Sequence, residues 1–224
     1  MNVKLFSSGL KGKIVFVGGI DTGIGKSYAT GHLAARLMQQ GLRVITFKPV
    51  QTGCNGFSDD LALHRRIQGI APLPEDLAGE TCPYLFPYPC SPHLAARIAG
   101  EHIDSGLIAR HAEALAARYD LVLVEGAGGL AVPLNGQDTT LDLLEREGWP
   151  LVLLTSGRLG SINHTLLSLE ACQTRNIPVA MLIYNRFPAS DPLIEADTAA
   201  YLQQRLRQDF PQAVFEEMGE IPLG

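Results

Sequence analysis

The sequence predicts an α/β fold, a single domain built on a mostly parallel sheet with helices on both faces. Two observations support this prediction. Short apolar segments of strand length alternate with helical patterns along the 224 residues, and the first segment runs directly into a glycine-rich turn. Strands that are apolar on both faces and separated by helices are typical of parallel sheets covered on both sides.

Five apolar segments are expected to form buried strands: Ile14–Val17, Val44–Phe47, Leu121–Val124, Leu151–Thr155 and Val179–Tyr184. Helices are expected at about 26–40, 59–68, 92–100, 105–118, 140–147, 162–175 and 193–209. We assign 13–224 to one domain and 1–12 to an N-terminal extension without a functional signal.

The first strand is followed by Gly19-Ile-Asp-Thr-Gly-Ile-Gly-Lys-Ser27, which we interpret as a phosphate-binding loop. The N–H groups and the positive end of the helix that follows suit the phosphates of a nucleotide. Lys26 is expected to reach the outer phosphates, and the Ser27 hydroxyl to hold Mg²⁺. The usual motif has its first glycine six residues before the lysine. Here that position is Ile20 and the glycine is Gly19, so the loop is one residue longer.

The residues after the loop form the amphipathic helix that this motif requires. Apolar side chains recur at three- and four-residue intervals from Ala29 to Met38, and Gly41 ends the pattern. The sequence therefore predicts a nucleoside triphosphate site in a P-loop NTPase-like fold.

Lys48 comes directly after the second strand, where its ammonium can be aimed at the same crevice as Lys26. Two lysines at one site suit phosphoryl transfer, because catalysis there is mostly positioning and charge neutralisation. A solvated lysine at the end of a strand is the alternative interpretation.

The segment 70–92 interrupts the alternation of strands and helices, since it holds six prolines and little periodicity. We expect a long structured loop. A binding or gating role and an ordinary surface excursion remain equally open.

The third strand delivers Glu125 at its carboxyl end, followed by Gly126-Ala-Gly-Gly129. Ligands bind at this edge of open α/β sheets. A metal-bound carboxylate is favoured over a simple turn cap, since Mg²⁺ prefers few carboxylates together with phosphate oxygens and water. Asp59, at the start of the helix 59–68, either caps that helix or joins Ser27 and Glu125 around the metal. The spacing does not decide between the two.

The fourth strand leads through Gly157-Arg-Leu-Gly160 into another helix start, at Ser161. This second positive helix end suits an anionic substrate group, although capping by Ser161 explains the same residues.

Bulk properties exclude several classes of function. A net charge of −5 and a pI near 5.7 argue against a nucleic-acid surface. Neither a membrane span nor a secretory signal is recognisable, so we expect a cytoplasmic protein. The four cysteines are scattered, which indicates reduced thiols rather than a disulfide framework or a zinc site.

Taken together, the motifs resemble those of dethiobiotin synthetase, the ATP-dependent carboxylase that closes the ureido ring in biotin synthesis. The resemblance covers nearly the whole chain from Ile14. It rests on segments that occur in the family's order: Gly19 with Asp21-Thr22, Lys48-Pro-Val50, Ser58-Asp59, Ser91-Pro-His93, Val124-Glu-Gly-Ala-Gly-Gly129, Leu159-Gly160, Ile162-Asn-His164, Asn185 and Gly219-Glu-Ile-Pro222.

The resemblance implies a reaction and a set of catalytic residues. One amine of 7,8-diaminononanoate would react with CO₂, the carbamate would attack the γ-phosphate of ATP, and the second amine would capture the resulting anhydride. Lys48, Lys26 and Thr22 would be catalytic. The enzyme would be a homodimer, in which the diamine contacts Thr52 and Lys48 and the substrate carboxylate binds a helix start of the partner, formed by Gly160, Ser161, Ile162 and Asn163.

The resemblance also implies the cofactors, ATP and Mg²⁺, with Ser27, Asp59 and Glu125 as metal ligands. Asn185 would contact adenine, and the chain would pass near the base at Pro222, Leu223 and Gly224. The implied nucleotide site further includes Gly23, Ile24, Gly25, Lys26, Ser27, Tyr28, Asp59, Glu125, Gly126, Ala127, Gly128 and Arg186. The chain departs from the family at Gly23, where Glu is frequent, and at Thr52, where Ser is common.

A regulatory ATPase of the deviant-Walker class, which shares this style of loop, is the alternative. Such proteins usually carry a second lysine near the start of the loop, where this chain has Gly18 and Gly19.

Overall fold

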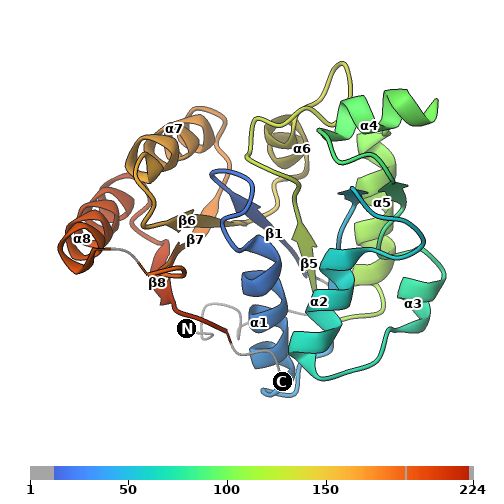
Figure 1. Cartoon of the computed structure of the whole chain (residues 1–224), viewed down its shortest axis with the longest axis horizontal. Coiled ribbons are helices and arrows are strands. Elements are labelled where there is room, and N and C mark those ends of the chain that lie inside the picture. The colour runs from blue at the N-terminus through green and yellow to red at the C-terminus, as the bar shows by residue number, and fades with distance from the viewer. Residues whose placement is uncertain (1–12, 190, 222–224) are drawn as a thin grey trace.

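The computed structural model describes residues 13–189 and 191–221, and Pro222, Leu223 and Gly224 lie outside these ranges. Its centre is a six-stranded parallel sheet of order β2-β5-β1-β6-β7-β8 (Figure 1). The strands are β1 (Lys13–Gly19), β2 (Val44–Phe47), β5 (Leu121–Glu125), β6 (Leu151–Ser156), β7 (Val179–Asn185) and β8 (Val214–Met218). The prediction of a mostly parallel α/β sheet is confirmed.

All seven expected helices are present, with ends that differ from the prediction by at most two residues. They are α1 (Lys26–Met38), α2 (Asp59–Gln68), α4 (Pro92–Ala99), α5 (Ser105–Ala116), α6 (Thr140–Glu147), α7 (Ser161–Thr174) and α8 (Pro192–Asp209). In Figure 1, α7 and α8 lie at one side of the molecule and α2 to α5 at the other, with α1 between them.

Four short elements were not expected from the sequence: the one-turn helix α3 (Pro74–Leu77), the edge strand β8, and a separate parallel pair formed by β3 (Val50–Thr52) and β4 (Tyr84–Phe86). Elements of three or four residues are too short to show a period. β8 carries two glutamates and is mostly half-exposed, so it lacks the apolar run of a central strand.

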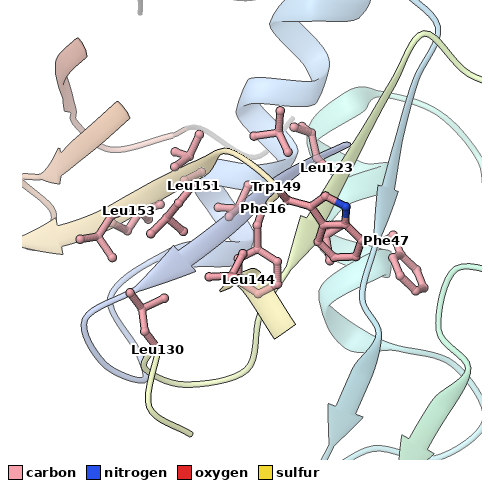
Figure 2. Packing of buried hydrophobic residues seen from close by; sticks show 14 of the residues in the cluster. Phe16, Phe47, Leu123, Leu130, Leu144, Trp149, Leu151 and Leu153 are labelled. Atoms are coloured by element: carbon pink, nitrogen blue, oxygen red, sulfur yellow. The ribbon is translucent and has the colours of Figure 1, made fainter. Parts of the chain in front are cut away.

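The core lies around the central strands, where every residue of β2, β5 and β6 is buried. Burial on both faces is what a parallel sheet with helices on both sides requires. Figure 2 shows the large side chains of this core, among them Phe16, Trp149 and Leu153. All four cysteines are free thiols, as the sequence predicted.

The register of the sheet places the carboxyl ends of β1, β2 and β5 side by side. Val17 of β1 pairs with Glu125 of β5, and Phe47 of β2 pairs with Val124 of the same strand. Lys48, the residue after Phe47, therefore leaves the sheet beside Glu125, and the glycine-rich loop leaves it on the other side. The carboxyl edge of the sheet positions the candidate site.

The proline-rich segment is structured, as expected, and a buried ion pair attaches it to α2. Asp76 accepts hydrogen bonds from Arg65 Nε and Nη2, both at 2.7 Å, and from Thr81 Oγ1 and the Leu73 N–H, also at 2.7 Å. The backbone N–H of Lys48 donates to the Thr81 carbonyl at 2.8 Å. This segment therefore supports the strand end from which Lys48 projects.

Asp76→Asn tests this attachment. Removing the charge leaves the Arg65 guanidinium buried without its counter-ion, which typically costs about 3–5 kcal/mol of unfolding free energy. Burial raises the pKa of Asp76, but Arg65 and Thr81 outweigh it and the net pKa is lowered. The contribution of Asp76 is thus complete above the unfolded pKa of about 4 and is lost as the pH falls through the lower folded value.

Denaturant titrations of both proteins at pH 7 and pH 3 measure the effect, and the difference is expected to shrink at pH 3. Arg110→Gln, in the exposed pair between Arg110 and Asp104, is the control and should leave stability unchanged within error. Equal effects of the two substitutions would contradict the attachment role.

Candidate active site

The carboxyl ends of β1, β2 and β5 open into a cavity of about 1080 Å³. Twelve of the residues expected at the site line it: Thr22, Gly23, Gly25, Lys26, Ser27, Tyr28, Lys48, Thr52, Glu125, Ala127, Gly128 and Asn185. The proline-rich segment contributes Pro89, Cys90, Ser91 and Pro92 to the wall. This favours a binding role for that segment over a plain surface excursion.

The phosphate-binding loop leads into α1 without a side-chain cap. Gly25 occupies the N-cap position with a φ of 92°, in the left-handed region that favours glycine. The first N–H groups of α1 have no acceptor within the helix, and the residues Gly25 to Tyr28 that carry them line the cavity. This end of α1 is built to receive an anion.

Lys26 folds back along its own loop. Its Nζ donates to the Asp21 carbonyl at 2.7 Å. Gly19 lets the loop pack closely, because a Cβ there would lie 2.5 Å from Ile24 Cδ1 and 3.1 Å from Lys26 Cδ. Burial, followed by the nearby Lys48 ammonium, lowers the pKa of Lys26 from 10.5 to about 8.

Lys48 lies at the centre of a buried cluster of charges. Its Nζ is 2.6 Å from Asp60 Oδ2, 2.8 Å from Glu125 Oε1 and 3.2 Å from the Gly126 carbonyl, so each of its three hydrogens has an acceptor. The Ser27 hydroxyl oxygen lies 2.8 Å from Asp60 Oδ1 and 2.8 Å from Glu125 Oε1. The cluster therefore joins the phosphate loop, β2, α2 and β5.

Both charged partners remain ionised although they are buried. Burial alone would lower the pKa of Lys48, but the Glu125 and Asp60 carboxylates outweigh it and raise that pKa above its ordinary value. Burial would raise the pKa of Glu125, but Lys48 and His64 outweigh it and the net pKa is lowered. The site thus presents a fixed ammonium and a fixed carboxylate at neutral pH.

The oxygen atoms of this cluster fit Mg²⁺. Two carboxylates and one hydroxyl converge beside the phosphate loop, and Mg²⁺ takes one or two carboxylates while phosphate oxygens and water complete its ligands. Within the ranges 13–189 and 191–221, no group of three or more His, Cys, Asp or Glu side chains is arranged to hold a metal alone. An ion shared with a nucleotide suits this donor set better than a closed protein cage.

The structure brings Asp60, rather than Asp59, to Ser27 and Lys48. Asp59 is the first residue of α2 and is exposed, whereas Asp60 lies on the face of the helix that points into the cavity. Ser58 caps α2 by accepting from the Leu61 N–H, so neither aspartate is needed for that role. The sequence led us to expect an acidic side chain from the start of α2 at the site. The structure has one there, but it is Asp60, because the helix turns Asp60 rather than Asp59 toward the cavity.

Asn185 lines the cavity and is held in place by two hydrogen bonds. Its Nδ2 donates to the Ile24 carbonyl at 3.0 Å, and its Oδ1 accepts from the Phe187 N–H at 3.0 Å. Arg186 does not line the cavity, because its side chain turns to Glu217 at 2.6 Å. Ile24 and Gly126 are buried and also lie outside the lining.

The turn before α7 lies apart from this cavity, since none of Gly160, Ser161, Ile162 and Asn163 lines it. An ion pair between Arg158 and Asp21 connects that turn to the phosphate loop. Ser161 is buried and its hydroxyl contacts Ser156 Oγ at 3.0 Å. Within one copy of the chain, Thr52 lines the cavity and this helix start does not.

His64 is the main site residue that the sequence interpretation missed. It is completely buried, with Nε2 at 2.7 Å from Glu125 Oε2 and Nδ1 at 3.0 Å from Thr46 Oγ1. A signal was present in the sequence, because His64 lies four residues after Asp60 and therefore on the same face of α2. Recognising it required knowing which face of α2 points toward Glu125.

Comparisons with known proteins agree with this chemistry. A family model described as "AAA domain" matches residues 13–223. The chain is 56% identical over 204 residues to "ATP-dependent dethiobiotin synthetase BioD 2" of Haemophilus ducreyi, covering 91% of this chain and 97% of that protein. It is 50% identical over 211 residues to the protein of the same name from Pasteurella multocida, covering 94% and 99%. The protein named "ATP-dependent dethiobiotin synthetase BioD" from Chlorobaculum tepidum is 49% identical over 199 residues, covering 89% and 83%.

Solved structures with a similar fold are more distant in sequence. A ParA family ATPase from Chlorobium tepidum has a TM-score of 0.54 at 16% identity, covering 93% of this chain and 85% of that one. The MinC:MinD cell division protein complex of Aquifex aeolicus has a TM-score of 0.54 at 13% identity, covering 94% and 82%. These likenesses show the P-loop NTPase fold alone. No helix in the described ranges is long and apolar enough to cross a membrane.

The pKa of Lys26 predicts how triphosphate binding depends on pH. A bound polyphosphate favours the charged ammonium, so affinity should be highest below about pH 8, where Lys26 is protonated, and should fall as the pH rises above it. The limiting slope is about tenfold per pH unit for one required proton.

Binding of a fluorescent ATP analogue between pH 7 and 9.5 measures this slope. Lys26→Arg is the matched control, because arginine stays charged over the whole range and should flatten the profile. The same slope in both proteins would show that another group is responsible.

Proposed function

This chain belongs to the family of ATP-dependent dethiobiotin synthetases, and from that membership we propose that it is a ligase that carboxylates 7,8-diaminononanoate and closes the ureido ring of dethiobiotin. The observation that carries the proposal is the placement of Lys48. It is a buried ammonium whose pKa the neighbouring carboxylates raise, and it lies beside Glu125, at the cavity into which the anion-binding end of α1 opens.

The proposed reaction runs in three balanced steps. One amine of the substrate adds to CO₂ and loses a proton, which gives a carbamate. A carbamate oxygen attacks the γ-phosphorus of ATP, the bond to the β–γ bridging oxygen breaks, and ADP leaves. The second amine then attacks the carbonyl carbon of the mixed anhydride, and the ring closes with release of phosphate and a proton.

Lys48 is proposed to stabilise the negative charge of the carbamate and of the phosphoryl group in transfer. An ammonium held in place by carboxylates needs little reorganisation when that charge develops, which is how preorganised sites lower barriers. Lys26 and Thr22, which line the same cavity, are proposed to assist from the phosphate loop.

Mg²⁺ is proposed to be held by Ser27, Glu125 and an aspartate of α2. When bound, it would neutralise phosphate charge. The loop residues Gly23, Gly25 and Tyr28 and the residues Ala127 and Gly128 line the part of the cavity proposed for the nucleotide phosphates. Asn185 marks the proposed base end, and Pro222, Leu223 and Gly224 lie outside the described residues.

The diamine is proposed to contact Thr52 and Lys48. Thr52 is the last residue of β3, which pairs with β4 of the proline-rich segment, and it lines the cavity. We propose a homodimer in which the α7 start of a second copy receives the substrate carboxylate, which agrees with its position outside the cavity of its own chain. A cytoplasmic location is part of the same proposal.

The regulatory ATPase alternative is not favoured. ParA and MinD share the fold at 16% identity or less, and fold alone does not assign a function. The three relatives described above, at 49–56% identity, are each named as dethiobiotin synthetases.

The direct test is to incubate the purified protein with ATP, Mg²⁺, labelled bicarbonate and diaminononanoate. We expect acid-stable label in dethiobiotin together with ADP formation, and no such product from the wild-type protein would reject the proposal.

Lys48→Met should lower kcat by about 100-fold or more, because the charge of Lys48 is needed mainly in the transition state. ATP-analogue binding should change little. Turnover at the wild-type rate would remove Lys48 from catalysis.

The metal site is tested by Asp60→Asn and Asp59→Asn side by side. Asp60 contacts Ser27 and Lys48 whereas Asp59 is exposed, so Asp60→Asn should raise the Mg²⁺ concentration for half-maximal activity by the larger factor. The measurement is an Mg²⁺ titration at fixed free ATP. A larger increase for Asp59→Asn would show that Asp59 is the metal ligand, as the family resemblance implies.

A further inference from the structure

A continuous buried chain of hydrogen bonds lies behind Glu125. His64 Nε2 contacts Glu125 Oε2 at 2.7 Å, His64 Nδ1 contacts Thr46 Oγ1 at 3.0 Å, and Arg65 Nη1 donates to Thr46 Oγ1 at 2.8 Å. His64 and Thr46 are completely inaccessible to solvent. The chain connects the carboxylate to the Arg65–Asp76 ion pair and through it to the proline-rich segment.

For a neutral imidazole at position 64, the direction of every bond in this chain follows from its ends. A guanidinium only donates, so Thr46 Oγ1 accepts from Arg65. In the described part of the chain, the only other hydrogen-bond partner of this hydroxyl is His64 Nδ1, so the Thr46 hydrogen points to that nitrogen. An ionised carboxylate only accepts, which requires a hydrogen on His64 Nε2. One tautomer of His64 satisfies both contacts, with the proton on Nε2.

The two oxygens of Glu125 therefore have separate partners. Oε2 accepts from His64, whereas Oε1 faces Ser27 and Lys48 at 2.8 Å each. A carboxylate bound through one oxygen can rotate about its terminal torsion, because that torsion is soft. A second bond at the other oxygen fixes the plane of the group.

We propose that His64 is a positioning residue, which fixes the Glu125 carboxylate so that Oε1 is directed at the metal and phosphate side of the site. The inference rests on the proposed role of Glu125 as a metal ligand. Partners of this kind, bonded to a ligand rather than to the metal, typically contribute about 10- to 100-fold in metal affinity or activity. Thr46 and Arg65 hold the imidazole in the required tautomer and orientation.

The test compares two amides at position 64. In His64→Gln the amide nitrogen can take the place of Nε2 and donate to Glu125, whereas in His64→Asn the shorter side chain reaches only toward Thr46. We expect the Kd of Mg²⁺ to rise about 10- to 100-fold in His64→Asn and to stay within about threefold of the wild-type value in His64→Gln. The readout is calorimetric titration of Mg²⁺ into protein mixed with a non-hydrolysable ATP analogue, so turnover is not required.

A pair of substitutions at Thr46 tests the tautomer. Thr46→Ser keeps the hydroxyl and should bind Mg²⁺ as the wild type does. Thr46→Val has nearly the same shape but cannot donate to Nδ1, so it should weaken Mg²⁺ binding in the same direction as His64→Asn. The melting temperatures of all four variants show how far each substitution destabilises the fold, for comparison with its effect on Mg²⁺ binding.

The outcomes separate a positioning role from a structural one. If both amides at position 64 weaken Mg²⁺ binding equally, or if binding follows the loss of melting temperature, His64 acts only in packing and the inference is overturned. Wild-type Mg²⁺ affinity in folded His64→Asn overturns it as well. Absence of dethiobiotin formation by the wild type rejects the proposed function instead, and the Mg²⁺ titrations are read independently of it.

Discussion

The burial of one ionised carboxylate, Glu125, constrains most of the site. Moving an unpaired carboxylate out of water costs several kcal/mol, so such a group is retained only where donors surround it. Here Lys48, Ser27 and His64 supply those donors, and they come from the end of β2, the start of α1 and the middle of α2. Each of these elements must therefore dock correctly before Glu125 can be buried, which makes the geometry of the site a condition of the fold.

The two lysines of the site have different electrostatic characters for the same reason. Lys48 contacts two carboxylates, which hold its charge firmly, whereas the Nζ of Lys26 contacts a backbone carbonyl and its pKa is about 8. A fixed charge suits stabilisation of a transition state. The Lys26 charge is stabilised further when an anion approaches, which suits a residue that takes part in nucleotide binding. Proteins at 49–56% identity show the family, and the contacts of each lysine give a physical basis for the role proposed for it.

Sequence patterns predicted the five central strands, the seven longer helices and the glycine-rich loop, because each carries a strong periodic or compositional signal. They also placed Lys48 and Glu125 at one edge, since parallel strands end together. Patterns could not place Asp60 or His64, because the rotation of α2 about its axis is fixed by packing against α1 and by the Gln51–Ser58 hydrogen bond. They missed β3, β4 and α3, whose conformation depends on partners far along the chain rather than on local propensity.

Contacts at and beside the cavity join residues remote in sequence, with separations of 98 positions between Ser27 and Glu125 and 161 between Ile24 and Asn185. Contacts between residues so far apart in sequence form only after long loops have closed. Loop closure costs conformational entropy before these contacts can compensate for it, so it slows folding. A half-synthesised or partly folded chain consequently has the glycine-rich loop but not the surroundings that give it affinity. Nucleotide binding by this protein is therefore a measure of completed folding, and the bound ligand selectively stabilises the finished sheet against unfolding.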